Sequence, residues 1–217
     1  MNIEQARFNM IEQQIRPWDV LNLGVLELLA VVKREDFVPP AHRALAFVDT
    51  EVPLPGGQCM LAPKVEARIL QELAVGKHER VLEIGAGSGY MAALLAHKAQ
   101  QVTALEIDPE LAAFAAANLK RAGVMNANVV NADGASGLAG EGPFDVIVLS
   151  GSVAEVPEAL LSQLKVGGRL AAIVGAEPVM RAVLMTRSGA KGMERTVLFD
   201  TVAQRLRGFK EPTKFHF

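Results

Sequence analysis

The sequence feature best suited to chemistry is a glycine-rich segment after an apolar run, residues 81–89, which read Val-Leu-Glu-Ile-Gly-Ala-Gly-Ser-Gly. The apolar run predicts a buried strand, and the glycines predict a sharp turn into a helix, with a backbone that can lie against a ligand. A dinucleotide loop would read Gly-x-Gly-x-x-Gly, but here the third glycine comes one residue early and position 90 is Tyr90. Glu83 inside the strand end would repel a phosphate, so the segment favours a cationic or amine-bearing ligand such as S-adenosylmethionine.

Polar residues also follow the ends of the later apolar segments. Glu106 lies 21 residues after Gly85, where a carboxylate can accept hydrogen bonds from both hydroxyls of a ribose. Asp133 follows the third strand and could reach an adenine amino group, and Ser150 follows the fourth. Ligands of open α/β sheets bind beyond the carboxyl ends of the strands, so these residues are expected to converge. The predicted cofactor-binding residues are Glu83, Gly85, Gly87, Ser88, Gly89, Glu106, Ile107, Asp133, Gly134 and Ser150, with Gln58, Cys59 and Met60 from the preceding loop.

Each of these residues alone has an ordinary structural explanation, because glycines form tight turns and acids at strand ends are often solvated. Their succession at neighbouring strand ends favours a cofactor site, and the pattern predicts a methyltransferase. Other chemistries find no support: the four histidines form no zinc-type spacing with Cys59, and no Gly-x-Ser-x-Gly elbow or Walker loop occurs. No metal site is expected. Asp145 opens the fourth strand, away from the site, and Asp108 before Pro109 should cap a helix.

The elements that must position these residues follow from the hydrophobic pattern. From residue 80 onward, apolar segments alternate with helical ones, which predicts a doubly wound, mostly parallel Rossmann-like α/β sheet with helices on both faces. Two final apolar segments predict a closing hairpin, and so an antiparallel C-terminal strand. The expected strands are 80–84, 101–106, 127–131, 144–149 and 168–174, with the hairpin at 180–187 and 194–203. The expected helices are 3–15, 21–32, 64–73, 89–98, 109–122 and 156–164.

The N-terminal part is organised differently. Residues 49–63 are rich in proline and glycine and predict an irregular loop of the kind that often lines a site, and Pro63 is suited to start the next helix. We expect residues 1–63 to form N-terminal helices and this acceptor-side loop. Residues 64–217 are expected to form the S-adenosylmethionine-binding domain, and the two parts to make one compact unit.

The amino-acid composition limits the cellular compartments and binding partners that are expected for this protein. The chain has 217 residues, of which 50% are apolar, and a formal net charge of −2, which argues against bulk disorder and against a nucleic-acid charge field. Its single cysteine excludes an intrachain disulfide framework and fits a reducing compartment. The first ten residues lack a secretory h-region, and the longest apolar segment, 20–32, is too short to cross a bilayer. We therefore expect a soluble cytoplasmic protein without nucleic-acid or membrane partners. The sequence does not indicate the oligomeric state.

The C-terminal end combines basic and aromatic residues. The basic excess after Arg187 is expected to form a solvated edge strand and tail. The aromatic residues Phe209, Phe215 and Phe217 could dock on the body of the protein or on a second subunit, and the sequence leaves both alternatives open.

Several segments resemble the protein-L-isoaspartate O-methyltransferase family of class I methyltransferases over most of the chain. Residues 32–39, Val-Lys-Arg-Glu-Asp-Phe-Val-Pro, are similar to its Val-x-Arg-Glu-x-Phe-Val-Pro, and residues 85–90 resemble its Gly-Thr-Gly-Ser-Gly-Tyr loop. Asp133-Gly134 and Pro143-Phe144-Asp145 follow in the family order, and residues 156–168 carry its Val-Pro, Leu-Leu, Gln-Leu and Gly-Gly pairs. The resemblance implies S-adenosylmethionine as cofactor and carboxyl methylation of isoaspartyl residues in damaged proteins.

The acceptor side departs from the family pattern. Residues 57–63 read Gly-Gln-Cys-Met-Leu-Ala-Pro where the family has Gly-Gln-Thr-Ile-Ser-Gln-Pro, so Leu61 stands at the position of the family serine and the catalytic residues stay unassigned. Ser150-Gly151-Ser152 replaces its Thr-Ala-Ala, and Asp200-Thr201-Val202 its Val-Pro-Leu. Three alternatives remain for the acceptor: an isoaspartyl protein or peptide, a small molecule packing on Met60 and Leu61, or none, in a non-catalytic cofactor binder.

Overall fold

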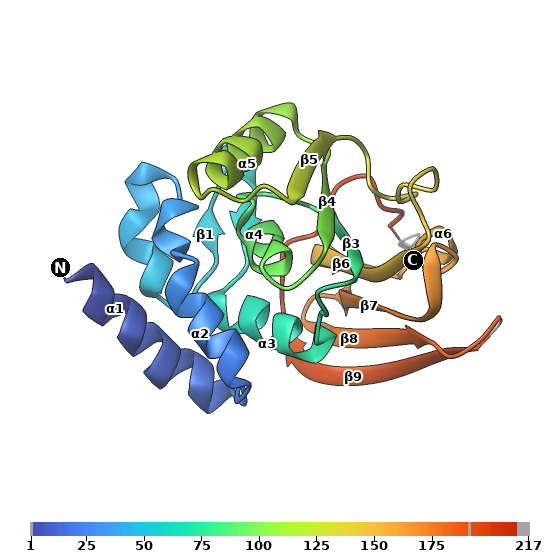
Figure 1. The fold of residues 1–217 in the computed structure, drawn as a ribbon, viewed down its shortest axis with the longest axis horizontal. Coiled ribbons are helices and arrows are strands. Elements are labelled where there is room, and N and C mark those ends of the chain that lie inside the picture. The colour runs from blue at the N-terminus through green and yellow to red at the C-terminus, as the bar shows by residue number, and fades with distance from the viewer. Residues whose placement is uncertain (1, 191, 212–217) are drawn as a thin grey trace, which may run out of the picture.

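The protein is described by a computed structural model that covers residues 2–190 and 192–211. Its N-terminal part is helical and packs beside the central sheet (Figure 1). The first helix continues through a π-helical turn to Ile15, the end expected from the apolar pattern, and Asn2 and Asn22 cap the first two α-helices by accepting backbone N–H groups. The helices are α1 (Ile3–Met10), η1 (Ile11–Ile15), η2 (Arg16–Trp18), α2 (Leu23–Val31), η3 (Arg34–Asp36) and η4 (Pro40–Phe47).

The expected irregular loop contains a small two-stranded hairpin. β1 (Val52–Pro53) pairs antiparallel with β2 (Cys59–Met60), and a 3-10 turn, η5 (Pro55–Gly57), joins them. Helix α3 (Pro63–Leu73) begins at Pro63, whose ring is suited to the first helical position because no intrahelical N–H bond is needed there.

A seven-stranded sheet forms the centre of the molecule, with the strand order β5-β4-β3-β6-β7-β8-β9 (Figure 1). The strands from β5 to β7 pair in parallel, whereas β8 is antiparallel to both β7 and β9. The mostly parallel α/β sheet with an antiparallel C-terminal part is therefore confirmed. The strands are β3 (Arg80–Ile84), β4 (Gln101–Glu106), β5 (Ala127–Asn131), β6 (Phe144–Val153), β7 (Leu164–Ala176), β8 (Val179–Arg187) and β9 (Met193–Thr201).

Two of the crossover helices match their expected positions and the third does not. α4 (Tyr90–Ala96) and α5 (Pro109–Arg121) follow β3 and β4, and the Asp108 side chain caps α5 by accepting two backbone N–H groups, as expected. α6 (Glu158–Leu161) is a single turn in place of the expected helix 156–164. The chain enters β7 at Leu164, because the Gln163 carbonyl already accepts the Phe144 N–H at 2.8 Å. Among the described residues, no helix has the length and apolar content needed to cross a membrane.

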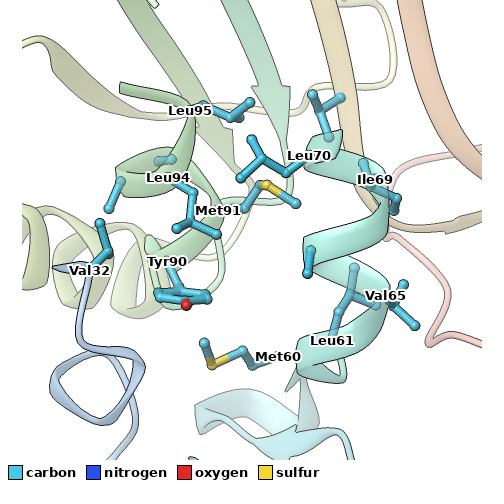
Figure 2. Close-up of a cluster of buried hydrophobic side chains, with 14 of the residues drawn as sticks. Val32, Met60, Leu61, Val65, Ile69, Leu70, Tyr90, Met91, Leu94 and Leu95 are labelled. Atoms are coloured by element: carbon cyan, nitrogen blue, oxygen red, sulfur yellow. The ribbon is translucent and has the colours of Figure 1, made fainter. Parts of the chain in front are cut away.

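The two faces of the sheet are covered unequally. The larger core lies between the sheet and helices α3, α4 and α5, and buried residues of the N-terminal segment, such as Phe37, belong to it. Figure 2 shows α3 and α4 facing each other there, with Leu70 and Met91 between them. The opposite face has a smaller core under α6, in which Leu82 and Leu149 are buried. Between β5 and β6, the described residues 132–143 form no helix, since they contain four glycines, which disfavour helix formation.

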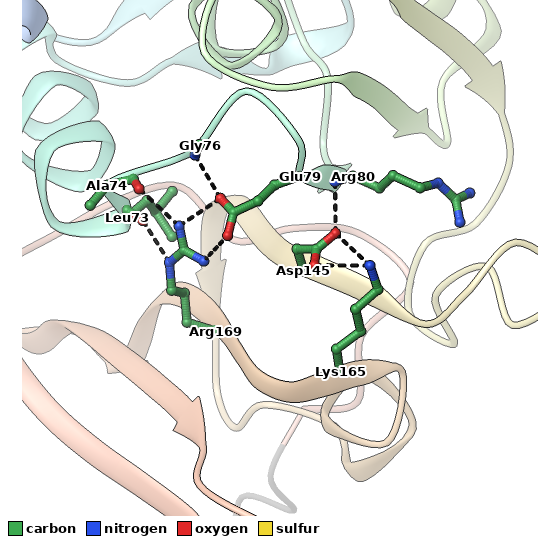
Figure 3. A network of polar contacts seen from close by, with 8 residues as sticks. All are labelled: Leu73, Ala74, Gly76, Glu79, Arg80, Asp145, Lys165 and Arg169. Atoms are coloured by element: carbon green, nitrogen blue, oxygen red, sulfur yellow. Dashed lines mark hydrogen bonds and ion pairs between the residues drawn. The ribbon is translucent and has the colours of Figure 1, made fainter.

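A polar network lies at the amino ends of the inner strands β3 and β6, whereas the glycine loop follows the carboxyl end of β3 (Figure 3). Asp145 accepts the Arg80 N–H at 2.8 Å and binds the Lys165 ammonium group at 2.8 Å. Arg169 from β7 binds Glu79 at 2.7 Å and donates to the carbonyl oxygens of Leu73 and Ala74. These contacts tie the end of α3 to β3, and they agree with the structural role expected for Asp145.

Candidate active site

The glycine loop lies at the carboxyl end of β3, where the chain turns toward α4. Gly85, Gly87 and Gly89 have φ angles of 87°, 52° and 81°, which L side chains rarely adopt. The Leu105 carbonyl of β4 accepts the N–H groups of Gly85 and Ala86, at 2.8 and 3.1 Å. The loop is thereby held flat against the end of the neighbouring strand, as a ligand cradle requires.

The structure brings most of the predicted residues together around two adjoining cavities. Gln58, Cys59, Gly85, Gly87, Glu106, Ile107, Gly134 and Ser150 line the main pocket. Glu83, Ser88 and Met60 line a small second cavity, which shares Cys59, Gly85, Gly87 and Ser150 with the main one. Two predicted residues line neither cavity. Gly89 lies at the start of α4, where a Cβ would come within 3.1 Å of the α5 backbone, and Asp133 is exposed.

Glu83 is a buried acid with an unused hydrogen-bonding atom. Its side chain is 0% exposed, and Oε1 accepts the Ser150 hydroxyl at 2.6 Å. Oε2 has no hydrogen-bond partner among the residues that the structure describes. Burial raises the pKa of Glu83 to about 8, the Ser150 hydrogen bond opposes this rise, and the nearby Glu66 and Glu106 add to it. A positively charged ligand group placed in the adjoining cavity would supply the missing partner. The acid therefore fits the amine of S-adenosylmethionine.

Glu106 ends β4 with its carboxylate toward the same pocket. It is 5% exposed, and its two oxygens accept the N–H groups of Gly87, at 2.9 Å, and Asp108, at 3.1 Å. An ionised carboxylate can accept about four hydrogen bonds, so both oxygens retain capacity for a ribose diol. The contact with Gly87 also couples the position of this acid to the glycine loop.

The part of the pocket where the sequence predicts the adenine has apolar lining residues. Ile107, Leu111 and Ala132 line it together with Gly134, and a Cβ at Gly134 would overlap the Ile84 side chain. Asp133 instead accepts the Ala135 N–H at 2.9 Å and lines a neighbouring surface cavity. Its expected contact with the adenine amino group stays a prediction.

The predicted acceptor side contains β2 and the residues that follow it. Met60 and Leu61 are 4% and 5% exposed and extend into the larger core near Tyr90 and Val65 (Figure 2). Leu61 also lines both cavities, so an apolar surface stands where the family serine would offer a hydroxyl. Burial and the contact of its Sγ with Glu51 at 3.2 Å raise the pKa of Cys59 to about 12, so this thiol is protonated at neutral pH and is not a nucleophile.

Two buried ion pairs lie behind the acceptor loop. Arg34 binds Glu66 and donates from Nη2 to the Leu61 carbonyl at 2.6 Å. Arg7 binds Glu35 nearby. Arg34 thus links the core ion pair directly to the backbone of the residue at the family serine position. The sequence did not indicate a role for Glu66, because an acid within a helical pattern is normally expected on the solvent-exposed face of the helix.

The pocket also contains residues from the C-terminal end that sequence reasoning missed. We call residues 202–209 the C-terminal strap. Gln204, Arg205, Leu206, Arg207 and Phe209 line the main pocket. Arg207 is exposed, as expected for a solvated tail, and binds Asp108. Arg205 is partly buried and donates to the Gly175 carbonyl, so the expectation of a solvated tail is wrong for Arg205. Phe209 packs against the smaller core, whereas Phe215 and Phe217 lie outside the described residues.

Comparisons with known proteins agree with this geometry. The sequence model of the family described as protein-L-isoaspartate(D-aspartate) O-methyltransferase matches residues 6–203. A protein-L-isoaspartate O-methyltransferase of Koribacter versatilis is 39% identical over 194 residues, 89% of this chain and 87% of that protein. One of Methanoculleus marisnigri is 41% identical over 171 residues, 79% of this chain and 78% of that protein.

Solved structures share the fold. A Plasmodium falciparum structure described as a protein-L-isoaspartate O-methyltransferase in complex with S-adenosyl-L-homocysteine superposes with a TM-score of 0.81 at 22% identity, covering 95% of this chain and 99% of that one. The relatives and the family match extend across both the N-terminal helices and the sheet. The chain belongs to the protein-L-isoaspartate(D-aspartate) O-methyltransferase family.

Proposed function

We propose that this protein transfers a methyl group from S-adenosylmethionine to the α-carboxylate of L-isoaspartyl residues in damaged proteins or peptides. The observation that carries the proposal is the pocket itself: in a chain of this family, two buried acids, Glu83 and Glu106, flank a glycine loop at the carboxyl ends of parallel strands. Their charges and positions suit the amine and the ribose of this cofactor. A reducing compartment such as the cytoplasm stays our prediction for its location, since Cys59 is the single cysteine.

The reaction does not require a general acid or base from the protein. When bound, S-adenosylmethionine would supply the methyl group of its sulfonium to the acceptor oxygen, and S-adenosylhomocysteine would be the leaving group. The acceptor carboxylate is already ionised at neutral pH, so no general base is needed. Glu83 would hold the cofactor amine, Glu106 would hold the ribose, and Met60 and Leu61 would exclude water from the acceptor side. Alignment of this kind can supply several kcal/mol of the rate enhancement.

The experiment that tests the proposal is transfer of labelled methyl to an isoaspartyl peptide, with the matching aspartyl peptide as control. We expect a base-labile methyl ester on the isoaspartyl peptide alone. Label on neither peptide, with cofactor binding intact in the same preparation, would contradict the repair reaction and favour a different acceptor. Label on both peptides would contradict the isoaspartyl specificity.

A small-molecule acceptor is the second candidate, and one observation favours it. Leu61 and Cys59 give the acceptor side an apolar side chain and a protonated thiol where the family carries hydroxyl groups. A carboxylate left without a hydrogen bond in a partly dry site costs about 1–3 kcal/mol. An acceptor with an apolar body could instead pack on Leu61. A non-catalytic binder of the cofactor is the third outcome, and any transfer above background by the purified protein argues against it.

Replacing Leu61 with serine separates the first two candidates. If the missing hydroxyl limits the isoaspartyl reaction, Leu61→Ser should raise kcat/KM for the isoaspartyl peptide about 10-fold or more, because hydrogen bonds to charged groups contribute roughly 1.5–3 kcal/mol. Leu61→Ala is the matched control, since it removes the same bulk without adding a hydroxyl. Equal activity of both variants and the wild type would mean that Leu61 does not limit the isoaspartyl reaction.

The raised pKa of Glu83 predicts pH-dependent cofactor binding. Near pH 6 the free protein holds Glu83 protonated, because its pKa is about 8, and a bound amine favours the ionised form. Binding should release up to one proton, so the affinity should increase with pH, by at most about tenfold per unit between pH 6 and 7. Calorimetry in two buffers of different ionisation enthalpy measures the released proton. A dissociation constant that stays flat over this range would argue against a contact between Glu83 and the amine.

A further inference from the structure

The C-terminal strap adds a short strand to the sheet at the position of the pocket. After β9 ends at Thr201, the chain turns back, and Arg205 pairs in parallel with Ser152 of β6. The Ser152 N–H donates to the Gln204 carbonyl at 2.8 Å, and the Leu206 N–H donates to the Ser152 carbonyl at 2.9 Å. In Figure 1 the red segment after β9 runs past β6 and β3 toward the top of the molecule.

The register of β6 shows which space this segment occupies. β3 ends with the pair Ile84 and Leu149, whereas β6 continues to Val153. One edge of this extension pairs with β7, through Ser152 and Ile173. The strap takes the other edge, in the place beyond the end of β3. That place is directly over the glycine loop.

Leu206 fills the space between the two segments that frame the pocket. Its Cδ2 lies 2.6 Å from where a Cβ would stand on Gly85, and 2.7 Å from the same point on Gly151. Both positions are glycines, so Leu206 packs onto bare backbone at the ends of β3 and β6. The space left in the main pocket is about 50 Å³. Pockets that hold ligands of drug size have volumes of roughly 300–1,000 Å³. The cofactor is of that size, so Leu206 would have to move before the cofactor could lie directly against the backbone of Gly85 and Gly151.

Besides its pairing with β6, the strap makes side-chain contacts with the loops that follow β4 and β5 and with η5. Arg207 binds Asp108 at 2.9 Å, after β4, and Gln204 donates to the Gly57 carbonyl at 2.7 Å, in the turn before β2. Gly208 lies against the Asp133 side chain, after β5. The Arg207 side chain is 43% exposed, and ion pairs at such exposed sites contribute little to stability. The ion pair between Arg207 and Asp108 is therefore one strap contact that can open at little cost in free energy.

We propose that the C-terminal strap is an autoinhibitory element that competes with S-adenosylmethionine for the space over the glycine loop. The inference rests on the proposed function, because it assumes that this pocket takes the cofactor. In the closed state Leu206 covers Gly85 and Gly151, and the cofactor binds only to the state in which the strap has moved away. The apparent affinity is then the intrinsic affinity reduced by the open fraction, and substitutions that loosen the strap increase both the affinity and the association rate.

Binding of S-adenosylhomocysteine to strap variants tests this inference. Arg207→Gln should bind about two- to fivefold more tightly than the wild type, and Leu206→Ala more tightly still, with faster association in stopped-flow measurements. Lys210→Ala is the matched control, because Lys210 is exposed and does not line the main pocket. Weaker binding by Leu206→Ala and Arg207→Gln would overturn the inference, since the strap would then be a lid that contacts the bound cofactor. No binding by the wild type or any variant would overturn the cofactor assignment as well.

Limited trypsin digestion gives a second readout without any substitution. The strap contains two trypsin sites, at Arg205 and Arg207. If the cofactor displaces the strap, saturating S-adenosylhomocysteine should increase the rate of cleavage at these two sites relative to Arg169, which is held in the network of Figure 3. Slower cleavage at both sites with the ligand bound would overturn the inference.

Discussion

Glu106→Ala should weaken S-adenosylmethionine binding at least about 100-fold. The substitution removes two hydrogen bonds from the ribose to a charged group, each worth roughly 1.5–3 kcal/mol, and about 1.4 kcal/mol corresponds to a tenfold change in affinity. It also removes the acceptor of the Gly87 N–H, which is held at 2.9 Å, so the glycine loop loses a contact. The measurement is titration calorimetry with S-adenosylmethionine on protein shown to be folded by thermal melting.

Two further variants make the result specific. Glu106→Gln keeps the shape and one acceptor oxygen but loses the charge, and it should fall between the wild type and Glu106→Ala. Glu110→Ala removes an acid from the first turn of α5, where its side chain is not part of the pocket, and it should bind like the wild type. An affinity of Glu106→Ala within threefold of the wild type would rule out the ribose role of this acid.

The parts of the site that could be predicted from the sequence are those fixed by local chemistry. β3, β4 and β5 begin and end at the expected residues, because each is a short parallel strand bounded by turn residues. β3 and β4 are mostly buried, whereas β5 lies at the edge of the sheet and is only partly buried. The roles of Glu83 and Glu106 as site residues could be predicted from their positions near the carboxyl ends of β3 and β4. The glycine loop could be predicted because its turn needs backbone angles that only glycine adopts readily, and the spacing of the glycines is visible in the sequence.

The parts that could not be predicted depend on contacts between distant segments. The strap reaches the pocket because Arg205 pairs with Ser152, and no pattern around either residue signals that pairing. The extension of β6 to Val153 has the same cause, since its last residues are ordered by β7 and by the strap. Glu66 reads as a surface acid on a helix, and only the packing of Arg34 against it makes it a buried ion pair.

Replacing Arg34 with methionine should lower the free energy of unfolding by about 3–5 kcal/mol, because removing one partner leaves the other charge buried and unpaired. Arg34 is 0% exposed, binds Glu66, and lies over the Tyr90 ring at 5.1 Å from its centroid. Burial raises the pKa of Glu66 to about 7, even though Arg34 lowers it, so this acid is costly to leave alone. For a chain of this size the melting temperature should fall by roughly 2–4 °C per kcal/mol. Chemical denaturation measures the free energy.

A double variant separates the stability of the core from the geometry of the acceptor loop. Arg34→Met with Glu66→Leu removes both charges, and buried ion pairs replaced by apolar residues are often neutral or stabilising, so most of the lost stability should return. Arg43→Ala breaks only an exposed ion pair with Asp36 and should change stability by less than about 1 kcal/mol. The double variant still lacks the hydrogen bond to the Leu61 carbonyl. Its stability should therefore recover while its kcat/KM for the methyl acceptor stays below that of the wild type. Recovery of both would mean that Arg34 stabilises the core without positioning the acceptor loop.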